Sequence, residues 1–488
     1  AMLRSLVGSE MCIRDSTDTG SIAANTLLTV AQANSSGTVD ASNAGTITGT
    51  AAEIIDAYAD STITEASDVA LTVNSGTATL TQARSLDDLT TGVITATIAD
   101  TALSDLLDDS TPLLDANGNN AFTITIGTAD ATVTAANLND LNALTTVNVN
   151  AANVDTISSS SLSDINTLYT AGGVSGLGDQ DVTVSDSGSI AAGTLTTITA
   201  ANGSGTLTAS SAATVTATAT EIVAALSDST ITLASNVALT VNSGTATLSQ
   251  TRTLNSGTGG VVTATIADTR VSDLLDGTTG LTETGGSNAY TITIGTADAE
   301  ITATNLTDLN GFTTVAVDAT NVTQITGTVA AANIVYTAGD NSEITGLGNE
   351  AVVISGETLN TLSDASTLNT LDGNTTGTVN AGSLTTIQGA LSDVLTAYGS
   401  NGITGLGNEA ITLTDEGSIS STDLNTLDTK TSGAITTHTD LATLTGTVAE
   451  LNEAFGSEGS TALGNEAVTV TDTTLDCLLY TSPSPRDS

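Results

Sequence analysis

The sequence predicts a mainly β fold with short helices, in which tandem repeats form a solenoid-like rod of parallel strands. Three observations predict it: long segments recur almost unchanged, short β-branched segments alternate with polar residues, and helical patterns lie between those segments. Repeat units of this kind cannot bury an apolar face alone and become stable by stacking on their neighbours. The alternative is a string of β-sandwich modules, each spanning one long repeat.

The longest repeat makes a module that occurs twice, since STITEASDVALTVNSGTATLTQ from Ser61 returns as STITLASNVALTVNSGTATLSQ from Ser229. A shorter repeat brings GLGNEA at Gly346 back at Gly405. We therefore expect each long module to contain three degenerate units of about 56 residues. The predicted segments are a three-unit module at 17–184, its second copy at 185–345, short units of about 57–59 residues at 346–476, and separate ends at 1–16 and 477–488.

Each short unit is expected to contain two strands and two helical turns. The strand candidates are β-branched segments that alternate with small or polar residues. They begin at Thr146, Val182, Thr291, Val352, Ile411 and Val468. Because helical turns separate these strands along the chain, we expect them to pair in parallel through crossovers.

Two patterns predict the helices. L-x-x-L spacing predicts helical turns from Leu138, Leu306 and Leu424. Thr-x-x-Glu capping boxes predict helix starts at three further places. These are Thr50 with Glu53, Thr218 with Glu221, and Thr447 with Glu450.

Two further features recur with the short units. An aromatic residue closes an apolar segment at five corresponding places, which are Tyr58, Tyr169, Tyr336, Tyr398 and Phe455, and Leu226 fills that place in one copy. The glycine-rich GLGNEAV lacks the spacing and the lysine of a phosphate-binding loop and precedes a strand. We interpret Gly346, Gly348 and Asn349 as a corner that needs positive φ.

The charge balance excludes several classes of partner. The chain carries 53 acidic residues against 7 basic ones, which gives a net charge of −46. Phosphate binding needs clustered Lys and Arg, so a nucleic-acid surface and a basic membrane-surface helix are both excluded. No apolar run reaches the roughly 18 residues of a membrane span, so we predict none in this segment.

Little in the sequence points to catalysis. His438 is the only imidazole and does not recur, so no repeated triad or His-rich metal site can exist. The acidic pairs Asp87–Asp88 and Asp108–Asp109 could serve a glycosidase or bind calcium. Neither pair returns intact in the second copy of the long module, where Asn255–Ser256 and Asp276–Gly277 stand. We therefore interpret the carboxylates as a solvated acidic face and assign no catalytic or cofactor-binding residue.

Binding residues are left unassigned for the same reason. Calcium binding by Asp and Asn side chains at repeated corners is left open, and no other cofactor is expected. Thr-x-Thr triplets recur and resemble the ladders of ice-binding proteins. They are Thr62/Thr64, Thr123/Thr125, Thr230/Thr232 and Thr291/Thr293. Cross-strand threonine pairing explains them without any ligand.

The two ends differ from the interior in composition. Both Cys, both Met and two of the three Pro lie within 1–16 or 477–488. LVGSEMCIRDS from Leu6 and CLLYTSPSPRDS from Cys477 resemble translated sequencing-adapter sequence. We therefore expect both ends to be non-native and the natural protein to continue on both sides.

The stretch from Ile403 to Phe455, ITGLGNEAITLTDEGSISSTDLNTLDTKTSGAITTHTDLATLTGTVAELNEAF, resembles repeats in giant secreted cell-surface proteins of marine picocyanobacteria. The resemblance covers nearly all of 17–476 and is strongest from about residue 340 onward. It implies an extracellular or cell-surface location, export without a cleaved N-terminal signal, and a structural role without catalytic residues.

Together these features predict a non-enzymatic structural segment of a long acidic surface repeat protein, acting as a stalk, adhesin spacer or surface coat. Its expected partners are neighbouring repeats of the same chain, with calcium or surface glycans left open. The alternative is a module that binds calcium, glycans or ice through laddered Asp, Asn or Thr.

Overall fold

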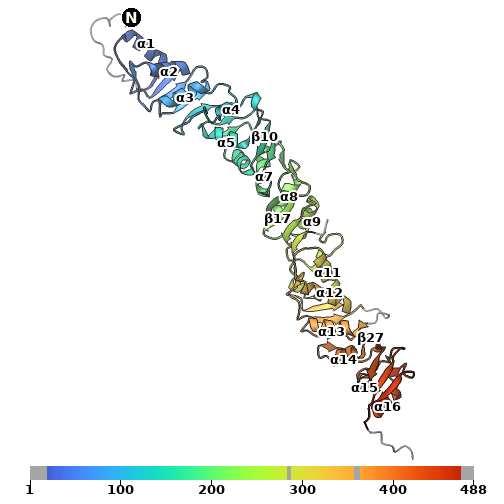
Figure 1. Ribbon diagram of the computed structural model, residues 1–488. Helices are drawn as coiled ribbons and strands as arrows, with labels where there is room; N and C mark the ends of the chain where they lie inside the picture. The colour runs from blue at the N-terminus through green and yellow to red at the C-terminus, as the bar shows by residue number, and fades with distance from the viewer. Residues whose placement is uncertain (1–18, 283–286, 357–362, 474–488) are drawn as a thin grey trace, which may run out of the picture. The chain divides into compact units, whose positions relative to one another are not determined.

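A computed structural model describes residues 19–282, 287–356 and 363–473 (Figure 1). The ends predicted to be non-native, 1–16 and 477–488, lie outside the described residues. The chain divides into two units, one reaching to Ser243 and including Gly257–Gly260, the other comprising Gly244–Ser256 and the residues from Val261 onward. Within each unit, the helices follow one another in chain order beside the strands (Figure 1).

Helices alternate with the strands and are short. In the first unit they are α1 Ala24–Asn34, α2 Ala51–Ala59, α3 Leu80–Leu89, α4 Leu103–Leu106, α5 Ala135–Ala143, α6 Leu162–Thr170, α7 Ala192–Asn202 and α8 Ala219–Ser227, with the 3-10 turn η1 Thr128–Asp130. Helix α9, Leu248–Gly257, falls across the division of the chain. In the second unit they are α10 Val271–Leu274, α11 Ala303–Gly311, α12 Val329–Asp340, α13 Ala365–Asn374, α14 Leu391–Gly399, α15 Ser421–Asp428 and α16 Val448–Gly456, with η2 Thr296–Asp298.

The strands of the first unit form several small sheets. One sheet has the order β1 Ser21–Ala23, β3 Thr46–Gly49, β5 Ala70–Val73, β6 Ile94–Thr97, β7 Ala121–Thr123. A second has the order β16 Ile231–Leu233, β14 Leu207–Ala209, β12 Asp181–Val184, β10 Thr156–Ser160, β8 Thr132–Val133. A third sheet contains the neighbouring strands β13 Ser189–Ala191, β15 Thr214–Thr218 and β17 Ala238–Ser243. Two further pairs are β2 Val39–Asp40 with β4 Ile63–Thr64, and β9 Val149–Asn150 with β11 Val174–Ser175.

The second unit is built in the same way. One sheet has the order β20 Glu300–Thr302, β22 Gln324–Gly327, β24 Ala351–Ile354, β26 Val379–Asn380, β28 Ile403–Thr404. A second has the order β25 Ser363–Asp364, β27 Thr386–Gly389, β29 Ala410–Leu413, β31 Ile435–Thr436, β33 Ser460–Thr461. A third consists of β30 Ser418–Ser420, β32 Thr443–Gly446 and β34 Ala467–Val470. Strand β18 Val262–Thr265 pairs with β19 Ala289–Thr291, and β21 Val317–Asp318 pairs with β23 Ile344–Thr345.

Parallel pairing aligns one buried side chain from each strand. In the first unit Ile47 pairs with Leu71, and Leu71 pairs with Ile94, so partners lie roughly 24 residues apart. All three are buried, and burying such a side chain contributes about 1.5–3 kcal/mol. Every strand pair assigned within the described residues is parallel, which confirms the predicted crossovers. Sandwich modules would contain antiparallel sheets instead.

Most helices pack against the next helix along the chain, and this row of helices covers one side of the buried strand residues. Contacts join α1 to α2 and α2 to α3, and an uninterrupted series joins α11 through α16. Most buried helix positions are small or aliphatic, for example Leu138 and Leu141 in α5. Ala, Val, Leu and Ile therefore fill a narrow core with little help from aromatic residues.

All three predicted capping boxes are present. Helix α2 shows the geometry: the Glu53 carboxylate accepts from the backbone N–H of Thr50 at 2.8 Å, and the Glu53 N–H donates to the Thr50 hydroxyl at 3.2 Å. The Thr218 and Thr447 boxes do the same for α8 and α16. An N-cap of this kind contributes about 1 kcal/mol, so these helix starts are determined locally.

Three other helices take their cap from the following repeat. The N-cap residues of α4, α10 and α14 are Ala102, Arg270 and Ala390, none of which caps through its side chain. Instead, Asp130, Asp298 and Asp415 accept from the first helical N–H groups at 3.0, 3.1 and 2.8 Å. A carboxylate at a helix N-terminus also interacts favourably with the helix dipole. These contacts join consecutive repeats.

The structure corrects the predicted balance of elements. Helices account for 34% and strands for 25%, so helix exceeds strand in a chain expected to be mainly β. Strands predicted from Val182, Val352, Ile411 and Val468 are present, whereas the one from Thr146 is reduced to Val149–Asn150. The L-x-x-L segments lie within α5, α11 and α15 as expected. The module boundaries at 184/185 and 345/346 remain predictions.

Candidate functional site: glycine corners and an acidic groove

His438 belongs to a local turn. It is partly exposed, and its Nδ1 accepts a hydrogen bond from the backbone N–H of Asp440 at 3.2 Å. No interaction described for it involves a nucleophile or a second imidazole. Its surroundings therefore supply no catalytic arrangement.

The two acidic pairs have different environments. Asp87 is buried on α3, where its carboxylate accepts from the Asn120 side chain at 2.8 Å and from the Ala116 N–H at 3.3 Å, while Asp88 is exposed. The interpretation as a solvated face is therefore wrong for Asp87, because residues far along the chain enclose it. Asp108 is exposed, and hydrogen bonds from the hydroxyl and N–H of Ser110 lower its pKa to about 2.

The predicted glycine corners share one backbone conformation. Gly346 and Gly348 have φ of 84° and 126°, and Gly405 and Gly407 have φ of 85° and 152°. A Cβ at Gly346 or Gly405 would lie 2.6 Å from a backbone nitrogen of the preceding repeat, so only glycine fits there. Asn349 is not among the positive-φ residues, so that part of the prediction is wrong.

Each of these corners ends in a fully buried carboxyl group. Glu350 Oε2 accepts from the Tyr336 hydroxyl at 3.1 Å and from the Gly348 N–H at 2.9 Å. Its second oxygen, Oε1, is buried and has no hydrogen-bond partner. Burial raises the pKa of Tyr336 above its ordinary value, so the phenol remains a donor to the glutamate.

The next corner repeats this geometry. Glu409 Oε2 accepts from the Tyr398 hydroxyl at 2.6 Å, from the Gly407 N–H at 2.8 Å and from the Asn408 N–H at 3.1 Å. Glu409 is also fully buried, and its Oε1 again lacks a partner. Two successive corners therefore leave the same carboxylate oxygen unsatisfied.

A third corner carries an amide in the same place. Gln180 Oε1 accepts from the Gly178 N–H at 2.7 Å and from the Tyr169 hydroxyl at 3.4 Å, as the glutamates do. Its Nε2 donates to the carbonyl of Val154 at 3.1 Å, to that of Gly176 at 3.4 Å and to Asp179 Oδ1 at 3.0 Å. Three oxygen acceptors therefore surround the second terminal atom.

The first copy pairs its tyrosine with an acid from a different position. Burial raises the pKa of Glu65 to about 7, and that of Tyr58 lies above its ordinary value for the same reason. Glu65 Oε1 and the Tyr58 hydroxyl are both buried without a partner. In the second copy both positions are apolar, as Leu226 and Leu233. A partly buried acid thus accompanies Tyr58, and both are replaced by leucine in the second copy.

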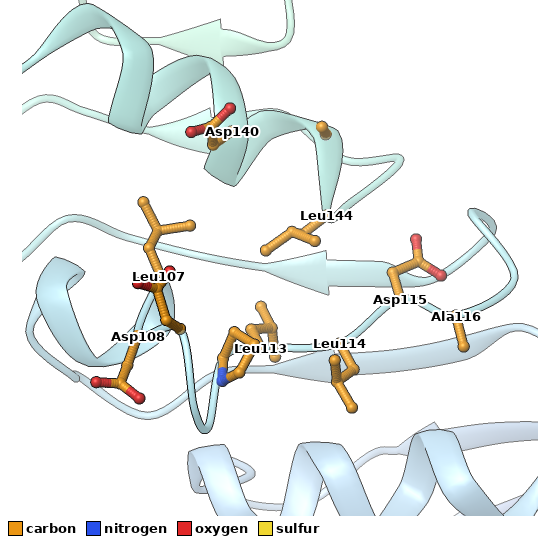
Figure 2. A pocket seen from close by; sticks show the side chains of 11 residues that line it. Leu107, Asp108, Leu113, Leu114, Asp115, Ala116, Asp140 and Leu144 are labelled. Carbon is orange, nitrogen blue, oxygen red and sulfur yellow. The ribbon is translucent and has the colours of Figure 1, made fainter.

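An open groove lies where 107–116 connect α4 to β7 (Figure 2). It has a volume of about 540 Å³. Leu107, Pro112, Leu114 and Leu144 supply apolar surface, with Asp108, Asp109, Asp115 and Asp140 around them. Figure 2 shows Asp140 on a helix and Asp115 on the loop. The groove combines apolar and carboxylate side chains, and no Ser, Cys, Thr, Lys or His side chain is among the residues that line it.

Each threonine triplet has one member in a paired strand, namely Thr64, Thr123, Thr232 or Thr291. Thr97 pairs with Thr123, and Thr265 pairs with Thr291, in register. Thr436 and Thr461 bring their hydroxyl oxygens to 3.1 Å. This is the cross-strand pairing expected for threonine on parallel strands.

Clustered metal ligands and membrane-spanning helices are both absent from the described residues. Among them, no three or more His, Cys, Asp or Glu side chains gather closely enough to share a metal ion. Every helix in this part of the chain is too short or too polar to cross a bilayer. A site built mainly from backbone carbonyls would need fewer such side chains.

Comparison with protein-family models, with curated proteins and with solved structures gave no match. The candidate site therefore has to be interpreted from its own geometry. The buried glutamates, Asn120 and the inter-repeat Asp caps were missed by sequence reasoning. The joint appearance of Tyr with a nearby Glu or Gln was the signal that could have revealed the corners.

Proposed function

We propose that this chain is a structural segment of a long, acidic, secreted surface protein, in which solenoid-like stacking makes it a spacer or stalk without catalytic activity. One observation carries the proposal: a strand–helix repeat of roughly 24 residues continues in register, and its recurring polar contacts join one repeat to the next. The polar groups in these contacts are paired with one another and stabilise the stacked repeats.

The amino-acid composition supports an extracellular location. Residues 17–476 contain neither Cys nor Met, so they offer none of the side chains most easily oxidised outside the cell. The net charge of −46 keeps neighbouring copies apart and soluble. The picocyanobacterial surface proteins that the repeats resemble agree with this location.

A spacer should shorten in whole repeats without losing its fold. Deleting residues 346–404 joins Thr345 to Gly405 and so connects two equivalent corners, removing α13 and α14. We expect the shortened chain to remain folded by circular dichroism and its maximum dimension in small-angle X-ray scattering to fall by about 10 Å, two strand spacings.

The control deletion removes 346–391 and joins the same Thr345 to the interior of α14, so equivalent backbone positions no longer meet. It should unfold the neighbouring repeats. If both deletions unfold the chain equally, or if the first leaves the maximum dimension unchanged, the repeats do not act as interchangeable spacers.

A further inference from the structure

The corners at Glu350 and Glu409 each leave one buried carboxylate oxygen without a hydrogen-bond partner. In both, Oε2 is engaged by tyrosine and glycine donors while Oε1 is buried and without a partner. Leaving a buried charged oxygen unpaired costs several kcal/mol. The same arrangement occurs twice, so it is a feature of the repeat.

Gln180 shows what the position of Oε1 requires. There the amide nitrogen donates to two carbonyls and to the Asp179 carboxylate. The pocket around this atom is therefore a set of oxygen acceptors that calls for positive charge. In the glutamate corners no described donor supplies it.

The backbone around the three corners is equivalent. Gly176, Gly346 and Gly405 have φ of 82°, 84° and 85°, and each would place a Cβ 2.6 Å from a backbone nitrogen of the preceding repeat. Sequence equivalence therefore matches the Val154 and Gly176 carbonyls with those of Val322 and Gly346 in one corner. In the other corner the counterparts are the carbonyls of Leu384 and Gly405.

The side chain at Asp179 also has counterparts, which are Asn349 and Asn408. Both asparagines are exposed, as are Gly346 and Gly405. The buried carboxylate thus faces an edge that solvent reaches, where an ion can enter and retain water ligands. Carboxylate, carbonyl and amide oxygens are the ligands that Ca²⁺ prefers.

We propose that the Glu350 and Glu409 corners are two cation sites of the Ca²⁺ type. The ligands are the glutamate Oε1, the carbonyls of Val322 and Gly346 or of Leu384 and Gly405, and the Asn349 or Asn408 amide oxygen, with water completing the shell. The Gln180 corner binds no cation, because its own amide nitrogen occupies the cation position. This inference is independent of the proposed spacer function.

Terbium provides a direct test, because Tb³⁺ replaces Ca²⁺ at oxygen sites and emits when a nearby aromatic ring is excited. The chain has no Trp and six Tyr, and Tyr336 and Tyr398 adjoin the two glutamates. We expect the full chain to show saturable Tb³⁺ emission that Ca²⁺ displaces. Tyr336→Phe and Tyr398→Phe should each remove a large part of it, whereas Tyr169→Phe at the glutamine corner should not.

Thermal unfolding supplies the second measurement. Glu350→Gln and Glu409→Gln copy the natural Gln180 corner and are expected to fold. Going from EDTA to 10 mM CaCl₂ should raise the wild-type midpoint by roughly 5 °C, and the double variant should lose most of that rise. Asp308→Asn, at an exposed position, is the control for general charge screening and should keep the full rise.

Two outcomes would overturn the proposal. An equal Ca²⁺ response in the wild type, the double Gln variant and the Asp308 control would show screening of the acidic surface alone. No Ca²⁺ response, together with a double Gln variant that is more stable than wild type at pH 8 but not at pH 5, would show that a proton fills the place assigned to the cation.

Discussion

The two copies of the long module build the same buried junction from different groups. In the first copy the Asn120 side chain donates to Asp87 at 2.8 Å, and in the second the Asn288 side chain donates to Asn255, also at 2.8 Å. All four residues are buried. A carboxylate and an amide are therefore interchangeable at one side of the junction, while the partner asparagine is the same in both copies.

The reason lies in what the partner asparagine accepts. Asn120 Oδ1 accepts a hydrogen bond from the backbone N–H of Ile94 at 3.0 Å, and Asn288 Oδ1 accepts one from the backbone N–H of Val262 at 2.8 Å. The asparagine thus satisfies a strand N–H and offers an N–H of its own. The asparagine amide does both through its two terminal atoms, whereas its partner needs only an acceptor.

The second copy adds a hydroxyl to its junction. Phe122 of the first copy corresponds to Tyr290, whose hydroxyl oxygen lies 3.0 Å from the Asn288 side-chain nitrogen. Both aromatic rings are completely buried. The second-copy junction, which contains Asn255, therefore has an additional polar contact. The first-copy junction, which contains Asp87, depends more heavily on its asparagine.

The largest effect is expected from Asn120→Ala. It leaves the Ile94 N–H unsatisfied and removes the principal partner of the buried Asp87 carboxylate, so the local free energy of unfolding should fall by about 3 kcal/mol. Asn288→Ala leaves only neutral groups unpaired and should cost about 2 kcal/mol. Hydrogen exchange by mass spectrometry over Ile94–Thr97 and Val262–Thr265 measures the two losses.

Asn119→Ala is the matched control, because Asn119 is only partly buried and its side chain makes one long contact of 3.4 Å. It should change the local free energy of unfolding by less than about 0.5 kcal/mol. An Asn288→Ala effect as large as that of Asn120→Ala would show that the charge of Asp87 does not matter.

A second contrast between the copies concerns Glu65, which corresponds to Leu233. Burial raises the pKa of Glu65 to about 7 in the folded chain, above its ordinary 4.5. The folded state then holds a proton that the unfolded state has released, so stability falls as pH rises from about 4.5 to about 7 and is level above that. Below about pH 4.5 both states hold the proton and the penalty vanishes.

Glu65→Gln removes this titration. Because Glu65 is only partly buried, solvent screening limits the gain to about 1 kcal/mol at pH 8, with no gain at pH 4. Urea unfolding of wild type and variant at the two pH values measures the difference. The same gain at both values would exclude titration of Glu65 as its cause.

The smallest effect is expected from Asp87→Asn, which gives the first junction the amide acceptor of the second. The amide oxygen keeps the bond from Asn120. The long contact of 3.3 Å from the Ala116 N–H is lost, but Ala116 is exposed and its N–H can bind water, so the change should stay within about 0.5 kcal/mol. Exchange over Ile94–Thr97 is again the measure. A loss of about 2 kcal/mol, the size expected when a buried hydrogen bond is broken, would show that the first copy requires the carboxylate. The comparison of the two junctions would then fail.

The sequence by itself determined the features that depend on neighbouring residues. The capping boxes at Thr50, Thr218 and Thr447 form within one helical turn, and the positive φ of Gly346 and Gly348 follows from the absence of a Cβ. Alternation of β-branched residues located four of the six strands that it predicted, and the crossovers between them predicted parallel pairing. All of these depend on interactions a few residues long.

Only the tertiary structure decided which acidic residues are buried and what they contact. Asp87 meets Asn120 across 33 positions, and Asp130 caps α4 from 27 positions beyond Leu103. Stacking one repeat on the next brings such residues together, and nothing in the local pattern distinguishes Asp87 from the exposed Asp88. A carboxylate is enclosed where the following repeat supplies its donors, and that partner is chosen by strand register.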